Sequence, residues 1–423
     1  MKTSMRVLAV SLLLGCVLPA APANAPAEPR VFHYENVLGT SLDMKIQAKS
    51  DAEADRAAEA ALAEFDRENR ILSAWTPDSE FSHWVKTRGT AERVSPELFE
   101  VLALFDAWRV KTGGALDASA ETAVQAWKKA ATEGRTPTKA ELAAAVAEMQ
   151  RPHWRLDAAA RTATHLDDAP IALNSFAKSY ITGHAADKAL AAGATGVALN
   201  VGGDIVLRGN VADDVAIADP RADAENDPPA DMVRLAGGTI ATSGDYRRGV
   251  EVGGAHFSHI VDPRTGETAE GVLSSTVVAE DPAEAGALAT AFSVMTPAAS
   301  KRLAERLGGV EYLLMLRDGR VVKSAGWAKL EEPGLERRGS GQSSMDAPRL
   351  NAPRLVNASY SPAVRRQVKK AAAAPAVPMD LTITLELTQP NSPRFRRPYV
   401  AVWVRDAENR PVRLISLWSE KPR

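Results

Sequence analysis

The residues best suited to chemistry lie close together in the second half of the chain. Thr242-Ser243-Gly244-Asp245 follows a strand-like run, and small hydroxyl residues with glycine can form a nest of backbone N–H groups that accepts phosphate oxygens. The imidazole of His259 titrates near neutrality and can take a proton from an attacking hydroxyl. Thr290 lies in an apolar stretch that predicts a helix, where its hydroxyl could serve a metal ion.

Each of these features also has an ordinary structural explanation. The 242–245 turn can be an Asx turn that closes a hairpin. A lone histidine is more often structural, and the hydroxyl of Thr290 can bond back to the preceding helical turn. Gly202-Gly203-Asp204 follows a strand pattern, and its glycines would let the backbone approach a ligand closely, although most such triplets are plain turns. Their meaning depends on whether the fold brings them together.

The elements that must position these residues are marked by helix caps. Ser50 with Glu53 forms a capping box ahead of apolar residues at helical spacing. Ser95 is followed by proline, which favours the first helical position, and a glycine pair ends that helix. Similar signals start two further helices, at Thr138 and at Thr296.

Strand patterns lie between the predicted helices. Residues 197–201 read as a strand, and residues 312–316 and 320–322 flank Asp318-Gly319, which is a strong hairpin turn. Because strands and helices alternate without a regular βαβ rhythm, we expect an α+β fold with mixed or antiparallel sheets. We assign residues 26–330 to this domain.

The first 25 residues predict an export signal. A positively charged start precedes an apolar run, Val7–Leu18, that is too short for a typical membrane span. Two endings stay open: a small-residue cleavage site at Ala23-Asn24-Ala25, or at Ala21-Pro22-Ala23, and a lipobox that would leave Cys16 as a lipid-bearing first residue. Either way we expect a periplasmic or otherwise extracytoplasmic protein, soluble or anchored as a lipoprotein.

Composition excludes several classes of function. The chain has 423 residues and a formal net charge of −2, which gives no reason to expect nucleic acid as a partner. Cys16 is the only cysteine, so no internal disulfide and no cysteine-ligated zinc is expected.

The order of the motifs resembles the ApbE family of FAD:protein FMN transferases over roughly Val31–Trp327. The matching segments are Leu38-Gly39-Thr40, Leu72–Glu80 with Trp75, Gly114-Ala115-Leu116-Asp117, Leu173–Lys178, Leu199–Ile205, Thr242–Asp245, Ser258-His259-Ile260 and the helix with Thr290. Several elements in the right order make coincidence improbable.

The resemblance implies a fold, a reaction and a set of site residues. Such proteins bind FAD, use Mg²⁺ across its pyrophosphate, move FMN onto a Ser or Thr hydroxyl of an exported or membrane-bound acceptor protein, and release AMP. By resemblance, the catalytic residues would be His259 and Asp245, and the metal ligands Thr290 and the backbone carbonyl of Ser175. The cofactor would be contacted by Leu38, Trp75, Ala115, Leu116, Asp117, Lys178 and Ile260, with Trp75 packing on the flavin nucleotide.

The departures from the family pattern concern the metal. Gly286 replaces an aspartate that holds magnesium, Ala172 replaces another aspartate, and Leu38 replaces methionine. Three acids, Asp204, Asp281 or Glu284, could substitute. We expect that Gly286→Asp strengthens the magnesium dependence and raises activity without harming the fold, because glycine inside a helix is itself unfavourable. If another acid already fills the site, a second carboxylate would add repulsion and activity would fall.

The C-terminal region has a different composition. Residues 331–378 are rich in Gly, Ser, Pro, Arg and Ala and predict a linker. Residues 381–388 alternate apolar and polar side chains, and strand patterns follow at 399–404 and 412–418. We assign 379–423 to a small all-β segment, similar to the start of a β-rich domain of unknown function found behind some family members. We do not expect it to fold alone.

Two alternatives to an active transferase remain at this point. One is a flavin-binding relative that lacks transfer activity or slowly hydrolyses FAD, because Gly286 offers no carboxylate. The other is an interaction protein that docks a partner through its C-terminal β segment. The sequence does not identify the acceptor protein, and self-flavinylation is not expected.

Overall fold

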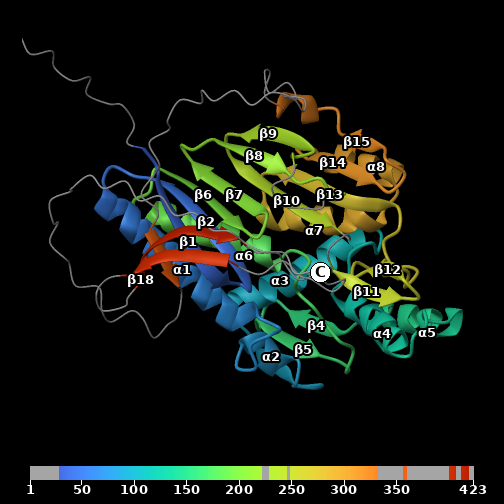
Figure 1. The fold of residues 1–423 in the computed structure, drawn as a ribbon. Helices are drawn as coiled ribbons and strands as arrows, with labels where there is room; N and C mark the ends of the chain where they lie inside the picture. The colour runs from blue at the N-terminus through green and yellow to red at the C-terminus, as the bar shows by residue number, and fades with distance from the viewer. Residues whose placement is uncertain are drawn as a thin grey trace, which may run out of the picture.

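The protein is described by a computed structural model that covers residues 28–221, 228–244 and 248–331, and the backbone of three strands within 356–418. Its centre is a nine-stranded sheet of order β15-β14-β13-β10-β7-β6-β2-β1-β16 (Figure 1). Neighbouring strands are antiparallel except for β1 and β16, which are parallel. The strands are β1 Arg30–Val37, β2 Thr40–Gln47, β6 Gly196–Val201, β7 Asp204–Gly209, β10 Gly238–Gly244, β13 Val272–Ala279, β14 Glu311–Leu316, β15 Val321–Lys323 and β16 Val356–Ser359.

Four smaller sheets accompany the main one. They consist of β3 Ala91–Arg93, β5 Thr162–His165 and β4 Trp154–Asp157, of β8 Asp213–Ile217 with β9 Asp231–Leu235, of β11 Gly249–Val252 with β12 Ala255–Ser258, and of β17 Val400–Arg405 with β18 Pro411–Trp418. The helices of the described residues are α1 Asp51–Leu72, α2 Glu80–Trp84, α3 Pro96–Lys111, α4 Glu121–Thr132, α5 Lys139–Met149, α6 Ala177–Ala191, α7 Pro282–Val294 and α8 Pro297–Leu307, with 3₁₀ turns at Ala118–Ala120 and Trp327–Lys329. The predicted α+β class with mixed and antiparallel sheets is confirmed.

Both faces of the main sheet are buried. Alternate side chains of β14 point to opposite faces: Tyr312 and Leu314 join the larger core, whereas Leu313 and Met315 join a second one. The larger core lies between the sheet and the helices α1, α6 and α7. The ribbon of β8 and β9 covers the second core together with Trp327, which is fully buried.

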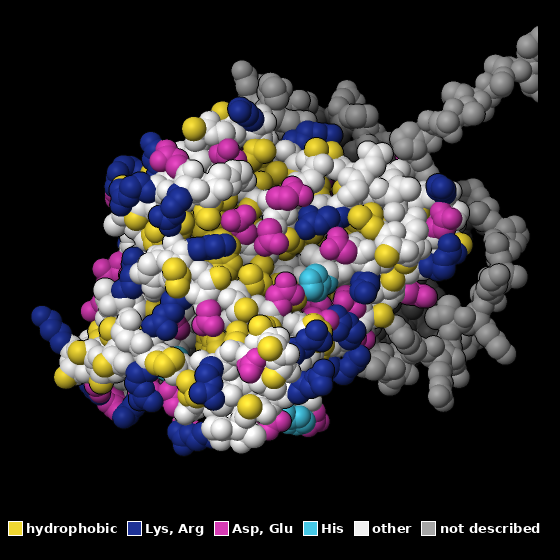
Figure 2. Space-filling view, turned by 180° about the vertical axis from the view of Figure 1, so that it is seen from behind, with side chains coloured by type: hydrophobic (Ala, Val, Ile, Leu, Met, Phe, Trp, Pro, Cys, Tyr) yellow, Lys and Arg dark blue, Asp and Glu magenta, His cyan; other side chains and the backbone are white. Residues whose placement is uncertain are grey.

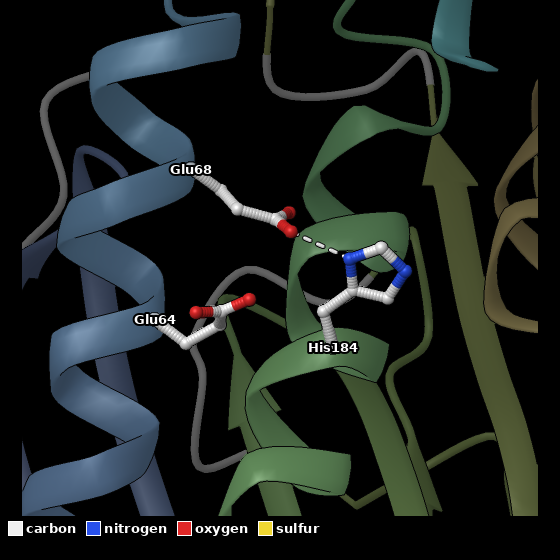
Figure 3. Close-up of side chains that lie close together, drawn as sticks. All are labelled: Glu64, Glu68 and His184. Carbon is white, nitrogen blue, oxygen red and sulfur yellow. Dashed lines mark hydrogen bonds and ion pairs between the residues drawn. The ribbon is translucent and has the colours of Figure 1, made fainter. Parts of the chain in front are cut away.

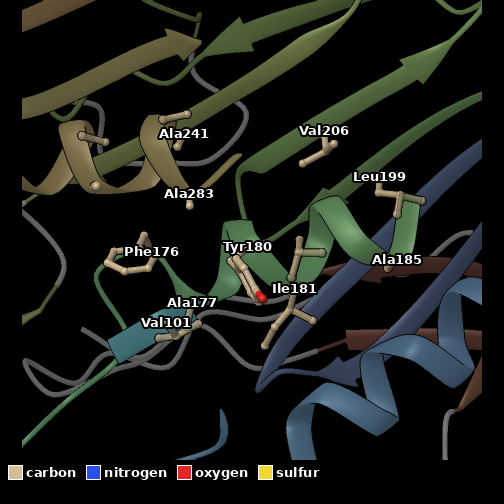
Figure 4. Close-up of a cluster of buried hydrophobic side chains, with 14 of the residues drawn as sticks. Val101, Phe176, Ala177, Tyr180, Ile181, Ala185, Leu199, Val206, Ala241 and Ala283 are labelled. Carbon is tan, nitrogen blue, oxygen red and sulfur yellow. The ribbon is translucent and has the colours of Figure 1, made fainter. Parts of the chain in front are cut away.

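Helix α6 lies inside the larger core, and its first turn contains Lys178 and Ser179, two residues of the candidate site described below. Tyr180, Ile181 and Ala185 pack against side chains from the sheet and from neighbouring helices (Figure 4). The sequence pattern does not predict this helix, because α6 is buried on several sides and lacks the one-sided apolar stripe that marks a surface helix.

The predicted helix starts are confirmed. Ser50 accepts a hydrogen bond from the backbone N–H of Glu53, although the Glu53 carboxylate accepts from Lys49 rather than from the cap. Thr138 and Glu141 form both arms of a capping box. The hairpin of β14 and β15 is also confirmed, with Asp318-Gly319 between the strands.

Several sequence expectations fall on residues that the structure does not describe. The export signal at 1–25 and the strand at 381–388 lie outside the described residues. Within the range assigned to the linker, the structure contains the short strand β16, and the strand patterns near 399 and 412 correspond to the paired strands β17 and β18. None of the described helices combines the length and apolar character needed to cross a membrane.

The surface carries both signs of charge. On the face drawn in Figure 2, basic and acidic side chains are interspersed rather than gathered by sign. This mixture of charges agrees with the net charge of −2.

Candidate functional site

Two tight turns lie side by side at one end of the main sheet. One joins β1 to β2, where Leu38 and Gly39 have φ angles of 50° and 77°, and the other joins β6 to β7, where Gly202 and Gly203 have 54° and 93°. A Cβ at Gly202 would lie only 2.6 Å from the Thr40 hydroxyl. The dihedral angle favours glycine at 202, and this close approach to Thr40 leaves no room for a side chain.

Leu38 is unusual at its position in the first turn. A positive φ is uncommon outside glycine, asparagine and aspartate, and residues held in such conformations are often found at ligand-binding sites. Leu38 is half-buried and packs on the larger core. Its predicted contact with the cofactor stays a prediction.

The N-terminus of α6 faces the second turn. The Asp204 carboxylate accepts a hydrogen bond from the Ser179 hydroxyl at 2.7 Å and lies 3.4 Å from the Lys178 ammonium. The same ammonium donates to the Gly202 carbonyl at 3.3 Å. The helix begins after Phe176 with no side-chain cap. Its first backbone N–H groups and Lys178 together can attract an anion such as phosphate.

The two residues predicted as metal ligands meet at the start of α6. The Thr290 hydroxyl, on α7, lies 3.1 Å from the Ser175 carbonyl oxygen. The Ser243 hydroxyl, at the end of β10, lies 3.4 Å from the Thr290 hydroxyl. Residues that are 47 and 115 positions from Thr290 in sequence therefore present hard oxygen atoms at one place, which is the donor type that Mg²⁺ prefers.

Gly286 is one of the places where α7 packs closely on α6. A Cβ built there would be 2.8 Å from the Ser179 hydroxyl and 3.1 Å from the Cα and Cβ of Phe176. Contrary to the expectation from the sequence, this crowding predicts that aspartate at this position destabilises the fold, because its Cβ would press on α6. The glycine offers no carboxylate, and it permits this close approach of the two helices.

The three acids considered as substitutes differ in position. The Asp281 carboxylate caps α7 by accepting from the Glu284 N–H at 2.7 Å, and it precedes Thr290 by more than two helical turns. Glu284 precedes Thr290 by six residues, which at about 100° per residue turns it to another side of the helix. Asp204 is connected to the start of α6 through Ser179. The Ser179 hydroxyl donates to the Asp204 carboxylate, and the same hydroxyl lies 2.8 Å from where a Cβ of residue 286 would be.

His259 follows the hairpin of β11 and β12. Its Nδ1 lies 3.1 Å from the Arg248 carbonyl oxygen. A carbonyl can only accept, so Nδ1 carries the proton and Nε2 presents a lone pair. Burial lowers the pKa of His259 below its ordinary value, so the imidazole stays neutral at neutral pH. This is the tautomer and the charge state that a general base needs.

The hairpin that carries His259 is anchored on α4. The ring of Phe257 packs on Trp127 at 4.8 Å between centroids, and the Trp127 indole donates to the Gly266 carbonyl at 2.9 Å. Arg264 pairs with Asp262 and donates to the carbonyl at the end of α7. These contacts hold the residues that follow Ile260 in place, and the side chain of Ile260 itself is buried.

Trp75 is the most exposed large apolar side chain of the described residues, with 88% of its surface exposed. Its loop is nevertheless fixed, because the Ser73 hydroxyl accepts from the N–H groups of Trp75 and Thr76, and Ser79 donates to the Ser73 carbonyl. A rigid loop that presents an unpacked indole ring is suited to stacking on a planar ligand.

The Gly114–Asp117 motif is more enclosed than expected for direct cofactor contact. Ala115 and Leu116 are 2% and 1% exposed, so only their backbone could meet a ligand. The Asp117 carboxylate accepts from the Ser119 N–H and hydroxyl and pairs with the Arg109 guanidinium at 3.0 Å. Asp117 also lines a cavity of about 80 Å³. Its predicted role in cofactor binding stays a prediction.

Two residues that hold the site residues in place have no counterpart among those predicted from the sequence. Asp245 lies outside the described residues, so its predicted catalytic role is not tested. Ser179, which holds Asp204, and Arg248, which fixes the His259 tautomer, were not predicted. No local sequence pattern marks either of them. Ser179 acts through a contact with a distant segment, and Arg248 acts through its backbone carbonyl, which is the same in every residue type.

Comparison with known proteins places the chain in a family. A model described as the ApbE family matches residues 38–314, so the chain belongs to the ApbE family. The FAD:protein FMN transferase of Klebsiella pneumoniae (strain 342) is 29% identical over 329 residues, which are 74% of this chain and 91% of that protein. That of Rhodobacter capsulatus is 29% identical over 323 residues, covering 74% of this chain and 60% of that protein.

Solved structures agree with this placement. The crystal structure of the ApbE protein from Thermotoga maritima has a TM-score of 0.64 and 25% identity, covering 72% of this chain and 100% of that one. The apo form of the Pseudomonas stutzeri flavinyl transferase ApbE has a TM-score of 0.60 and 23% identity, covering 73% and 99%. At that identity the second likeness speaks for the fold alone.

Proposed function

We propose that this chain is an FAD:protein FMN transferase that moves FMN from FAD to a Ser or Thr hydroxyl of an acceptor protein. The observation that carries the proposal is the meeting of the Thr290 hydroxyl with the Ser175 carbonyl at 3.1 Å. This contact lies beside the uncapped N-terminus of α6, whose Lys178 is 3.4 Å from Asp204. The names of the relatives, most of which match three quarters of the chain, support the same reaction.

The residues bring distinct functions to this reaction. The α6 N-terminus and Lys178 would bind the pyrophosphate of FAD, and Trp75 would stack on its flavin. The lone pair of His259 Nε2 would accept the proton of the acceptor hydroxyl as its oxygen attacks the phosphorus of the FMN half. The bond between the two phosphates breaks, and AMP leaves with the bridging oxygen. The products are FMN esterified to the acceptor and AMP.

The oxygen donors at the start of α6 fit a magnesium ion. The Thr290 hydroxyl and the Ser175 carbonyl would hold the ion, with Ser243 beside them and Asp204 as the carboxylate that Gly286 does not provide. A bound Mg²⁺ neutralises charge on the pyrophosphate. Asp204 is 7% exposed and tied to both Ser179 and Lys178, which supports its choice over Asp281 and Glu284.

The proposal is tested by incubating the protein with FAD, Mg²⁺ and a candidate acceptor that carries Asp, small residues, Ser or Thr, and then Ala. We expect a fluorescent acceptor band, a mass increase of one FMN less water, and one AMP per adduct. The acceptor with its hydroxyl residue changed to Ala is the control. Asp204→Asn should raise the Mg²⁺ concentration needed for half-maximal transfer, whereas Asp281→Asn should not.

A second function is favoured by Gly286. Without a carboxylate at this position the chain could release FMN and AMP from FAD to water, with no adduct on any acceptor. The same incubation distinguishes the two functions, because AMP would then form equally with and without the acceptor. A third proposal, that the segment 379–423 docks a partner, is tested by comparing acceptor binding of the full chain with that of a chain ending at 378.

We also propose that the mature protein works outside the cytoplasm. The apolar run Val7–Leu18 after a basic start supports this. Mass spectrometry of the mature N-terminus decides between the two endings: a diacylglyceryl group on Cys16, abolished in Cys16→Ser, identifies a lipoprotein, whereas a free N-terminus after Ala23 or Ala25 identifies a soluble one. Retention of the intact leader in the cytoplasmic fraction would refute export.

A further inference from the structure

A second group of side chains with metal-binding atoms lies between α1 and α6 (Figure 3). Glu64 and Glu68 are one turn apart on α1, and His184 comes from α6. One ligand atom from each lies within 4.8 Å of the others. None of the three residues belongs to the site proposed for FAD and magnesium.

Glu68 is the least compensated member of this cluster. It is fully buried, and Glu64 is 6% exposed, although glutamate is rarely buried unless it is paired. The Oε2 atom of Glu68 has no hydrogen-bond partner among the described residues. A buried polar atom left unsatisfied costs its full desolvation free energy, and the cost is larger when the group is charged. Such an atom, pointing between two helices beside a histidine, indicates a missing ligand.

The other oxygen of Glu68 and both oxygens of Glu64 are already oriented. Glu68 Oε1 lies 2.5 Å from His184 Nδ1 and 3.0 Å from the Arg67 guanidinium. Arg67 also binds both oxygens of Glu64, at 2.8 and 2.9 Å. Each carboxylate oxygen can accept a second interaction, so Arg67 would act as an outer partner that fixes both ligands.

The charges around the cluster do not balance. Arg67 also pairs with Glu97 at 2.8 Å, and Glu100 accepts from the Tyr180 hydroxyl, whose ring packs on His184. Four carboxylates, those of Glu64, Glu68, Glu97 and Glu100, thus lie around the guanidinium and the imidazole, with Lys188 acting on Glu64 from α6. With Arg67, Lys188 and the proton held between His184 and Glu68 all counted, the four carboxylates still leave an excess of negative charge. A divalent ion in place of that proton would neutralise it.

We propose that Glu64, Glu68 and His184 form a site for a divalent transition-metal ion such as Zn²⁺. Two carboxylates with one imidazole favour a transition metal over Mg²⁺ or Ca²⁺, because a nitrogen donor suits the softer ion. The ion takes the place of the proton held between His184 Nδ1 and Glu68. The His184 side chain is 36% exposed and provides access, and water completes the coordination.

The ion would clamp α1 to α6. His184 lies less than two turns beyond Lys178 and Ser179, which position Asp204. A bond network from Glu64 and Glu68 to His184 would therefore stabilise the helix that carries the start of the FAD site, without contributing an atom to it. The metal would act on folding stability rather than on the transfer step.

The test uses the purified full-length protein after removal of metals by chelation. Zn²⁺ is titrated by calorimetry, and Co²⁺ is followed by its visible absorption, in wild type, His184→Gln and Glu68→Gln. Thr290→Ala and Glu148→Gln are matched controls. Thr290 belongs to the proposed magnesium site, and Glu148 belongs to a second cluster of carboxylates and a histidine, which also contains His153 and Asp167. Circular dichroism first establishes that each variant is folded.

We expect wild type and both controls to bind one Zn²⁺, and His184→Gln to bind it at least about tenfold more weakly, as expected for loss of a ligand. Zn²⁺ should raise the unfolding midpoint of wild type but not of His184→Gln. His184→Gln is decisive if Glu68→Gln does not fold, because His184 is partly exposed. Absence of saturable binding in wild type, equal affinity in His184→Gln, or loss of binding in either control would overturn the proposal.

Discussion

Replacing Gly286 tests how closely α7 must approach α6. A Cβ at this position would lie 2.8 Å from the Ser179 hydroxyl and 3.1 Å from the Cα and Cβ of Phe176. Adding atoms to a packed interior typically costs about 1–3 kcal/mol, whereas the gain in helix propensity from glycine to aspartate is only about a few tenths. We therefore expect Gly286→Asp to lower the free energy of unfolding by about 1–3 kcal/mol.

Part of this cost can be relieved by a second substitution. Ser179→Ala removes the atom closest to the new Cβ, but it also removes the hydrogen bond to Asp204, worth about 1.5–3 kcal/mol for a charged acceptor. In the double variant the crowding that remains comes from Phe176. The double variant should therefore be more stable than the sum of the single effects predicts, by about 1 kcal/mol, within the range seen for residues in contact.

Urea unfolding of wild type, the two single variants and the double variant measures this coupling. Gly286→Ala, alone and with Ser179→Ala, is the control that adds the Cβ without the charge. If Gly286→Asp is as stable as wild type, or if the free energies add within about 0.5 kcal/mol, the α6–α7 contact is not what excludes a side chain. Magnesium titration of transfer should then show whether the new carboxylate of the Gly286→Asp variant lowers the half-saturating Mg²⁺ concentration; an unchanged or weaker response would mean that the metal site is elsewhere or already complete.

Three further predictions concern the remaining site residues. His259→Ala should lower the rate of transfer by about 10²–10⁴ and leave the dissociation constant for FAD within a few-fold, measured by calorimetry; transfer that survives nearly intact would make His259 structural. Because burial lowers the pKa of His259, its neutral form persists as pH falls. The acid limb of kcat/KM should therefore have an apparent pKa below the ordinary histidine value of 6.5, and this limb should disappear in His259→Ala. An apparent pKa above 6.5 contradicts the role of His259 as the base. Trp75→Ala should weaken FAD binding by about 0.5–1.5 kcal/mol if the ring stacks on the flavin. The unfolding midpoint should not change, because the side chain is 88% exposed. Val110→Ala, at a position that is 81% exposed, is the control and should change neither quantity.

The sequence by itself determined the elements that have local signals. Caps at Ser50, Ser95 and Thr138 predicted three helix starts, because a side-chain oxygen satisfies N–H groups of the first turn wherever that helix lies. Asp318-Gly319 predicted a hairpin, since its backbone preference is also local. The order of the motifs was enough to predict the family, which the comparison confirmed.

Only the tertiary structure decided which of the candidate residues meet. Whether Thr290 faces a ligand or the preceding turn depends on Ser175, which lies 115 residues away in sequence. Our proposal of Asp204, rather than two acids that are nearer to Thr290 in sequence, rests on the contact with Ser179. The helix that carries Ser179, α6, has no surface pattern that could reveal it in the sequence. Gly286 reads in the sequence as a lost carboxylate, yet its lack of a side chain is also a packing requirement between two helices. Contacts between distant segments carry no local signature, because they depend on where the main sheet places each element.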